Sequence, residues 1–94
     1  MTRDDMIEAL RTAYPMRIPP DASFVRRLWV EKVKDGDSLV RFGVKLHHPD
    51  WTSDPPPADA GFWWCLEMRN DKPRADMRFS CYENSAAEEW IYGL

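Results

Sequence analysis

The sequence predicts an α+β fold, with a four-stranded antiparallel sheet made of two hairpins and a helix at each end of the chain. Apolar residues recur at helical spacing near both termini and alternate with polar residues in the segments between. Asp35-Gly36 is a strong hairpin signal, and 94 residues suit a single domain over 1–94. We therefore expect the order α-β-β-β-β-α, with both helices packed on one face of the sheet.

The N-terminal helix is predicted from its cap, its apolar stripe and its stop. Thr2 can cap the first turn, and Asp5 stands at the position where an acidic side chain completes a capping box. Met6 and Leu10 belong to an apolar stripe at helical spacing, and Pro15 ends the segment.

The C-terminal helix is predicted on the same grounds. Ser85 and Glu88 form a capping-box pattern, and Trp90 and Ile91 belong to the apolar stripe. Gly93 is well placed to cap the end of the helix.

Alternation and turn residues predict four strands between the helices. The expected strands are Phe24–Val33, Leu39–His47, Gly61–Arg69 and Ala75–Glu83. In the first hairpin, a two-residue turn pairs Trp29 with Phe42 and Val25 with Leu46, and it places Val25, Trp29 and Val33 on the core face. A three-residue turn would exchange the faces of the first strand, because the side-chain period of a strand is two residues. We favour the two-residue turn.

The second hairpin is expected to turn at residues 70–74. Pairing Trp64 with Cys81 places the apolar residues of both strands on one face, which both helices would cover. The same register sets Glu67 opposite Arg78 on the other face, where opposite charges support the pairing. That outer face carries more charge and is expected to be open to water.

The Pro-rich loop at 48–60 is the most unusual stretch of the sequence. It carries Trp51 and leads into a strand with adjacent Trp63 and Trp64, which strand alternation cannot bury on one sheet face. One interpretation is that the loop folds back and Trp51 covers Trp63 in a satellite core. The other is that these aromatic residues form a protein-binding patch.

We predict a non-enzymatic module that binds another protein through the outer sheet face and the Pro-rich loop. Aromatic residues would anchor the partner and basic residues would complement its charge. The expected contact residues are Trp51, Trp63, Tyr82, Arg26, Arg41 and Lys45. Small domains without a catalytic motif are often inhibitors, adaptors or subunits, and an antagonist carried by a phage or other mobile element fits this profile by analogy.

Two other binding functions stay open on the sequence. The first hairpin is basic, and with Phe24, Trp63 and Tyr82 nearby it could stack on and hold single-stranded nucleic acid. The net charge of −3 does not indicate general phosphate binding. The basic residues are Arg26, Arg27, Lys32, Lys34, Arg41 and Lys45. Pairing of exposed edge strands could instead make a homodimer, so we expect either a monomer or a homodimer.

Catalysis is a weaker alternative, built on His47, His48 and Cys65. No nucleophile elbow or Gly-rich phosphate loop accompanies them. Cys65 and Cys81 are far apart in sequence and expected on opposite sheet faces, which does not suit a metal site. We therefore expect no catalytic residue, metal or cofactor.

The location of the protein is predicted from what the sequence lacks. Met1 is followed by Thr2-Arg3-Asp4-Asp5 rather than by an apolar segment, which does not resemble a secretory signal. Apolar runs also fall short of a membrane span. We expect a cytoplasmic protein without membrane contact.

Overall fold

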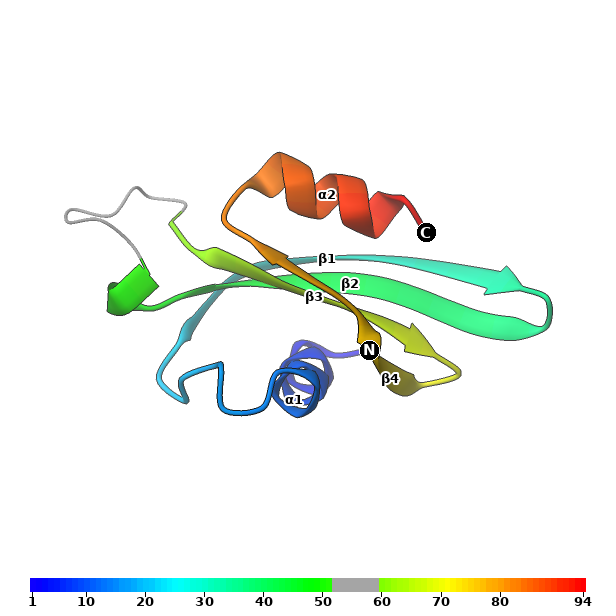
Figure 1. The fold of residues 1–94 in the computed structure, drawn as a ribbon, viewed down its shortest axis with the longest axis horizontal. Helices are drawn as coiled ribbons and strands as arrows, with labels where there is room; N and C mark the ends of the chain where they lie inside the picture. The colour runs from blue at the N-terminus through cyan, green and yellow to red at the C-terminus, as the bar shows by residue number, and fades with distance from the viewer. Residues whose placement is uncertain (52–59) are drawn as a thin grey trace.

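The computed structural model describes residues 1–51 and 60–94, and it confirms the predicted α+β fold and element order (Figure 1). The four strands form one antiparallel sheet in the order β1-β2-β3-β4. The elements are α1 (Arg3–Ala13), β1 (Ser23–Lys34), β2 (Asp37–His47), a 3₁₀ turn η1 (Pro49–Trp51), β3 (Phe62–Arg69), β4 (Lys72–Cys81) and α2 (Asn84–Tyr92).

The two helices cover opposite faces of the sheet, so the prediction that both pack on one face is wrong (Figure 1). α1 packs through Met6 and Leu10 on a core that includes Trp64. α2 packs through Ala87 and Ile91 on a second core that includes Trp63. The reason lies in β3, whose apolar residues point to both faces and therefore need a cover on each.

The start of α1 is as predicted. The backbone N–H of Asp5 donates to Thr2 Oγ1 at 3.1 Å, and the N–H of Thr2 donates to Asp5 Oδ2 at 3.2 Å. This reciprocal capping box satisfies two backbone donors at the helix start. At the other end, the Tyr14 hydroxyl donates to the backbone oxygen of Cys65 at 3.0 Å, which ties the helix to β3.

The predicted cap of α2 is only half right. The helix begins at Asn84, with Glu83 in the N-cap position and without a side-chain capping hydrogen bond in the part of the chain that the structure describes. The capping box predicted from Ser85 and Glu88 is therefore wrong. Gly93 does follow the last turn, and its N–H donates to the backbone oxygen of Glu89 at 3.0 Å.

The first hairpin has the predicted two-residue turn. Asp35 and Gly36 both take positive φ, 53° and 83°, as the tight hairpin turns require. Trp29 accordingly pairs with Phe42. The register therefore places Trp29 on the α1 side of the sheet, with Phe42.

An irregularity near the start of β1 changes one predicted pair. The register shifts between Phe24 and Arg26, so Phe24 rather than Val25 lies opposite Leu46. The shift places Phe24 on the α1 side, where the Arg3 guanidinium lies 5.0 Å from the centre of its ring.

The second hairpin is one residue out of the predicted register. Trp64 pairs with Ser80 instead of Cys81. The turn is shorter than predicted, with positive φ of 49° and 63° at Asn70 and Asp71, and the pairing shifts again between Leu66 and Glu67. The shift of one residue at Trp64 exchanges the faces of β4 from Arg78 to Cys81.

The changed register moves several side chains of β4. Phe79 and Cys81 pack with α2, so Cys65 and Cys81 share a sheet face, contrary to prediction. Arg78 turns to the α1 side and donates to the backbone oxygen of Ala13. The predicted pairing of Arg78 with Glu67 is therefore wrong.

Gly43 allows α2 to approach the sheet closely. A Cβ at this position would lie 2.8 Å from Ile91 Cδ1 and 2.8 Å from Cys65 Sγ, closer than such atoms can pack. The glycine thus leaves a notch in β2, which Ile91 of α2 fills.

Candidate functional site

α2 lies on the sheet face that was predicted to bind a partner, and it buries two of the predicted contact residues. The Trp63 and Lys45 side chains are both buried. Trp63 Nε1 and Lys45 Nζ donate to Asn84 Oδ1 at 2.9 and 3.0 Å. Both residues therefore hold α2 in place, and the expectation that they touch a partner directly does not suit their position.

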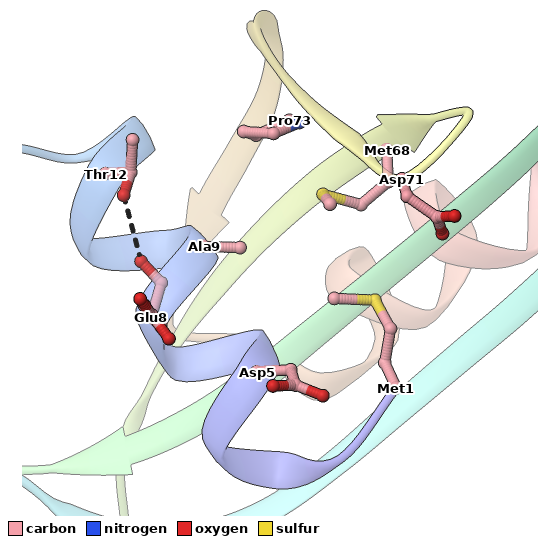
Figure 2. A pocket seen from close by; sticks show the side chains of 8 residues that line it. All are labelled: Met1, Asp5, Glu8, Ala9, Thr12, Met68, Asp71 and Pro73. Atoms are coloured by element: carbon pink, nitrogen blue, oxygen red, sulfur yellow. Dashed lines mark hydrogen bonds between the residues drawn. The ribbon is translucent and has the colours of Figure 1, made fainter.

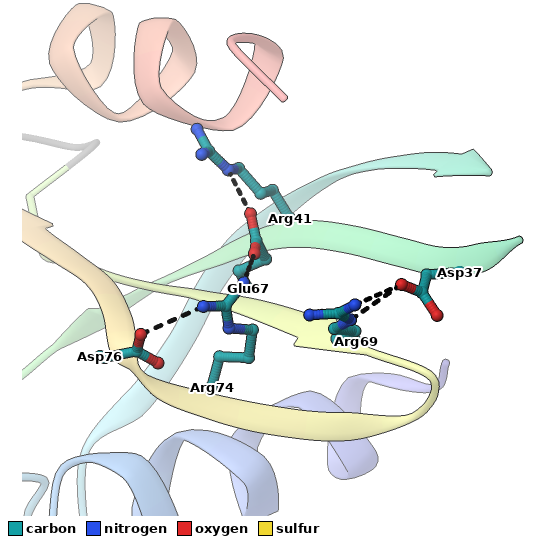
Figure 3. Close-up of polar contacts among 6 residues, drawn as sticks. All are labelled: Asp37, Arg41, Glu67, Arg69, Arg74 and Asp76. Atoms are coloured by element: carbon teal, nitrogen blue, oxygen red, sulfur yellow. Dashed lines mark hydrogen bonds and ion pairs between the residues drawn. The ribbon is translucent and has the colours of Figure 1, made fainter. Parts of the chain in front are cut away.

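Arg41 belongs to an ion-pair network on the same face (Figure 3). Its Nε lies 3.0 Å from Glu67 Oε1, and Arg74 Nη1 lies 3.2 Å from Glu67 Oε2. Arg74 extends the network to Asp76 at 3.1 Å. Arg41 Nη1 also donates to the backbone oxygen of Trp90 at 2.8 Å. The buried carboxylate of Glu67 thus joins β2 and β4, and Arg41 connects it to α2.

Two other predicted contact residues remain accessible, Arg26 beside α2 and Tyr82 beside Phe62, which packs on the α1 core. The Arg26 guanidinium lies 5.1 Å from the centre of the Trp63 ring and 3.7 Å from Glu88, and its side chain is partly exposed. Tyr82 is 60% exposed, with one side of its ring against Phe62. Arg26 and Tyr82 do not form one exposed surface with Trp63, because Trp63 is buried.

Trp51 packs on the α1 side of the sheet. The centre of its ring lies 5.6 Å from that of Trp64 and 6.2 Å from that of Phe62. Trp51 therefore extends the α1 core instead of covering Trp63, which points to the other face. The rest of the Pro-rich loop, residues 52–59, lies outside the described residues.

The basic hairpin is less available to nucleic acid than its sequence indicates. Arg26, Arg41 and Lys45 all contact α2 or its ion pairs. Trp63, which was expected to stack on a base, is buried. Binding of a single strand needs exposed aromatic and basic groups together, and α2 separates them on this face.

The geometry also disfavours the catalytic alternative. Cys65 is buried beneath α2. This burial is the main cause that raises the pKa of its thiol to about 12, and the nearby Cys81 is a smaller one. A protonated thiol is a poor nucleophile. His48 contacts Asp21, at 3.1 Å from Nε2 to Oδ1. Among residues 1–51 and 60–94 there is no group of three or more side chains able to hold a metal ion.

Alkaline pH is expected to destabilise the protein through these buried protons. Burial raises the pKa of Cys65 from 9.0 to about 12 and that of Tyr14 from 10.0 to about 12. The folded chain therefore holds both protons more tightly than the unfolded chain. Its stability is constant below pH 9 on this account and falls above it, by about 2 kcal/mol from Cys65 alone at pH 10.5.

Urea unfolding between pH 8 and pH 10.5 measures this loss, and a Cys65→Ala variant provides the comparison. The free energy of unfolding should decline less steeply with pH in the variant than in the wild type, because only the wild type has the thiol at position 65. Parallel declines in the two proteins would contradict the assignment to Cys65.

The surface left uncovered by both helices follows β1. α1 lies over β2, β3 and β4, so the α1 side of β1 is open. Trp29 and Val33, expected in the core, are 47% and 77% exposed there. The alternation correctly identified their side of the strand, but α1 does not reach it. We define the β1 surface by Phe24, Arg27, Trp29, Glu31 and Val33.

β1 is also an edge strand whose outer backbone is regular. From Arg26 to Lys34 its pairing with β2 is unbroken, and in the described residues it has no neighbour on its other side. The opposite edge, β4, contains Pro73 and a register shift opposite Leu66 and Glu67. Proline and irregular pairing hinder the addition of a further strand, so β1 is the more receptive edge.

A separate pocket of about 500 Å³ lies between α1 and the β3–β4 turn (Figure 2). Asp5, Glu8 and Asp71 form an acidic rim beside the apolar side chain of Met68. Hydrogen bonds from Thr2 hold the pKa of the Asp5 carboxyl below its usual range. All three acidic residues are exposed to solvent, so water competes with a ligand for them.

Comparisons of the chain with protein-family models, curated proteins and solved structures found no match. Neither helix in the described residues is long and apolar enough to cross a membrane.

Proposed function

We propose that the protein is a non-enzymatic module that binds another protein through the β1 surface. The observation that carries this proposal is the exposure of Trp29 and Val33 beside the outer edge of β1. An exposed strand edge provides backbone donors and acceptors for an added strand, and the neighbouring side chains provide affinity and specificity. Tryptophan is among the residues that most often anchor such interfaces.

The β1 surface replaces most of the contact residues predicted from the sequence. Arg26 stays in the proposal because it lies on β1, although its side chain points to the α2 side. Arg27 adds a second guanidinium, 5.1 Å from the centre of the Trp29 ring. A role as an inhibitor from a phage or mobile element, acting in the cytoplasm, remains part of the proposal and is supported only by small size and analogy.

Photo-crosslinking from single positions tests this function. A photoreactive amino acid at Val33 samples the β1 surface, and the same amino acid at Met16 is the control, because Met16 is a fully exposed apolar residue elsewhere. We expect protein adducts from position 33 at several times the yield from position 16. Nuclease-resistant adducts identify a protein partner, and nuclease-sensitive ones identify nucleic acid.

The same experiment can refute the proposal. Equal yields from the two positions, or nuclease-sensitive adducts alone, would show that the β1 surface is not a protein-binding site. A Trp29→Lys variant carrying the photoreactive group at position 33 should lose its adducts, since the proposed anchor is gone.

A further inference from the structure

We infer that the partner of the β1 surface is a second copy of the chain. In this homodimer the two β1 strands pair antiparallel, Trp29 faces Trp29 of the partner across a twofold axis, and the two sheets become one continuous sheet. The inference rests on the proposed function, since it names the partner for the same surface. The backbone pattern of β1 and the order of its charges support it.

The backbone pattern follows from the turn. Lys34 and Asp37 are the outer residues of the two-residue turn, and such turns close with a hydrogen bond between these positions. In an antiparallel pair, every second residue carries the hydrogen bonds to the neighbouring strand. Lys34, Lys32 and Val30 therefore bond to β2, while the intervening residues present N–H and C=O groups outward. Those residues are Arg27, Trp29, Glu31 and Val33.

The outward residues are complementary to their own copy. With Trp29 on the twofold axis, Arg27 lies opposite Glu31 of the partner, and Glu31 lies opposite Arg27 of the partner. Opposite charges directly across an antiparallel pair are stabilising, and so are paired aromatic residues. A twofold axis perpendicular to the sheet places the α1 sides of both protomers on the same face of the joined sheet. The side chains of Arg27, Trp29 and Glu31 therefore meet those of the partner.

Neighbouring registers lose this complementarity. Centring the axis on residue 27 would place Arg27 opposite Arg27 of the partner, and centring it on residue 31 would do the same for Glu31. Like charges directly opposite one another are destabilising. Among registers centred on an outward residue, the order of charges therefore favours the one centred on Trp29, which aligns the outward backbone groups of both strands.

The α2 side of β1 tolerates the same register. Leu28, which is half-buried, lies opposite Val30 of the partner, so two apolar side chains meet. Arg26 lies opposite Lys32 of the partner, which is a pair of like charges. Glu88 of the same protomer lies 3.7 Å from Arg26 and reduces this repulsion.

Charge reversal on the strand tests the dimer. Light scattering over a range of protein concentrations should show a wild-type dimer, and Arg27→Glu and Glu31→Arg should each raise its dissociation constant about tenfold or more. The two variants mixed together should form a heterodimer, because position 27 of each then faces an opposite charge at position 31 of the other. The double variant Arg27→Glu, Glu31→Arg should dimerise as the wild type does.

Lys72→Glu is the matched control. It makes the same change in net charge as Arg27→Glu. Lys72 lies on the exposed start of β4, at the opposite edge of the sheet, so the variant should leave the dimer unchanged. The inference is overturned if the wild type stays monomeric at every concentration, or if the single charge variants dimerise as well as the wild type does.

Disulfide trapping tests the register independently. In a Cys81→Ser background, Trp29→Cys should form a covalent dimer on mild oxidation, since paired residues in a sheet are close enough for a disulfide. Val33→Cys should not, because position 33 lies far from its own copy in this register. More covalent dimer from Val33→Cys than from Trp29→Cys would overturn the register.

The dimer and the proposed function can fail separately. Adducts of twice the chain mass from position 33 identify self-association, and adducts of another mass identify a different protein. A monomeric wild type that still forms adducts of another mass from position 33 would overturn the dimer and leave the β1 surface as a protein-binding site. Absence of adducts together with a monomeric wild type would overturn both.

Discussion

Replacement of Trp63 by alanine is expected to lower the free energy of unfolding by about 4 kcal/mol, the usual cost of removing a large buried aromatic side chain. The Trp63 ring fills the second core between the sheet and α2, against Ile91 and Cys65. Its Nε1 also donates to Asn84 at 2.9 Å, so the variant loses a contact that holds the start of α2.

Urea unfolding followed by far-ultraviolet circular dichroism measures this effect without relying on tryptophan fluorescence. Trp63→Phe should lose only part of the stability, because it keeps most of the ring and removes the N–H donor. Tyr92→Ala is the control, since Tyr92 is an exposed aromatic residue at the end of α2 and should change stability by less than about 1 kcal/mol. A Trp63→Ala loss as small as that of the control would contradict the role of Trp63 in the core.

Glu67→Gln is expected to cost about 3 kcal/mol, at the lower end of the range for a broken buried ion pair. The variant keeps the shape of the side chain and removes the negative charge between Arg41 and Arg74. Arg41 is mostly buried, so it cannot recover the loss by full hydration. Arg74 is about one-third exposed, which limits the cost.

Two further variants separate the charge from the packing. Asp76→Asn removes an exposed carboxylate from the same network and should change stability by less than about 0.5 kcal/mol. A double variant with methionine at positions 41 and 67 should recover much of the loss, since apolar groups can replace a buried ion pair. Thermal and urea unfolding at one protein concentration provide the measurement. A Glu67→Gln protein as stable as Asp76→Asn would show that the network contributes little.

Local signals in the sequence were sufficient for most of the elements. The Thr2–Asp5 capping box and the Asp35-Gly36 turn act over a few residues, and both are present as predicted. These local signals failed in the second hairpin, where two turn lengths and two pairings of the strands compete. The turn at 70–71 is shorter than predicted, and Glu67 pairs with Arg74 instead of Arg78.

The candidate site could not be predicted because it depends on which strands the helices cover. Trp29 and Val33 have the pattern of core residues, and they are exposed only because α1 lies over the other three strands. Trp63 and Lys45 have the pattern of an open outer face, and they are buried only because α2 lies over them.

The sequence by itself determined the four strands, the two helices and, beyond the irregularity near Phe24, the side of the sheet to which residues of the first hairpin point. These follow from turn chemistry and side-chain periodicity, which act along the chain. Only the tertiary structure decided which faces are covered, because that depends on how far each helix reaches across the sheet. The adjacent Trp63 and Trp64 already required a cover on each face, and the second helix supplies one of them.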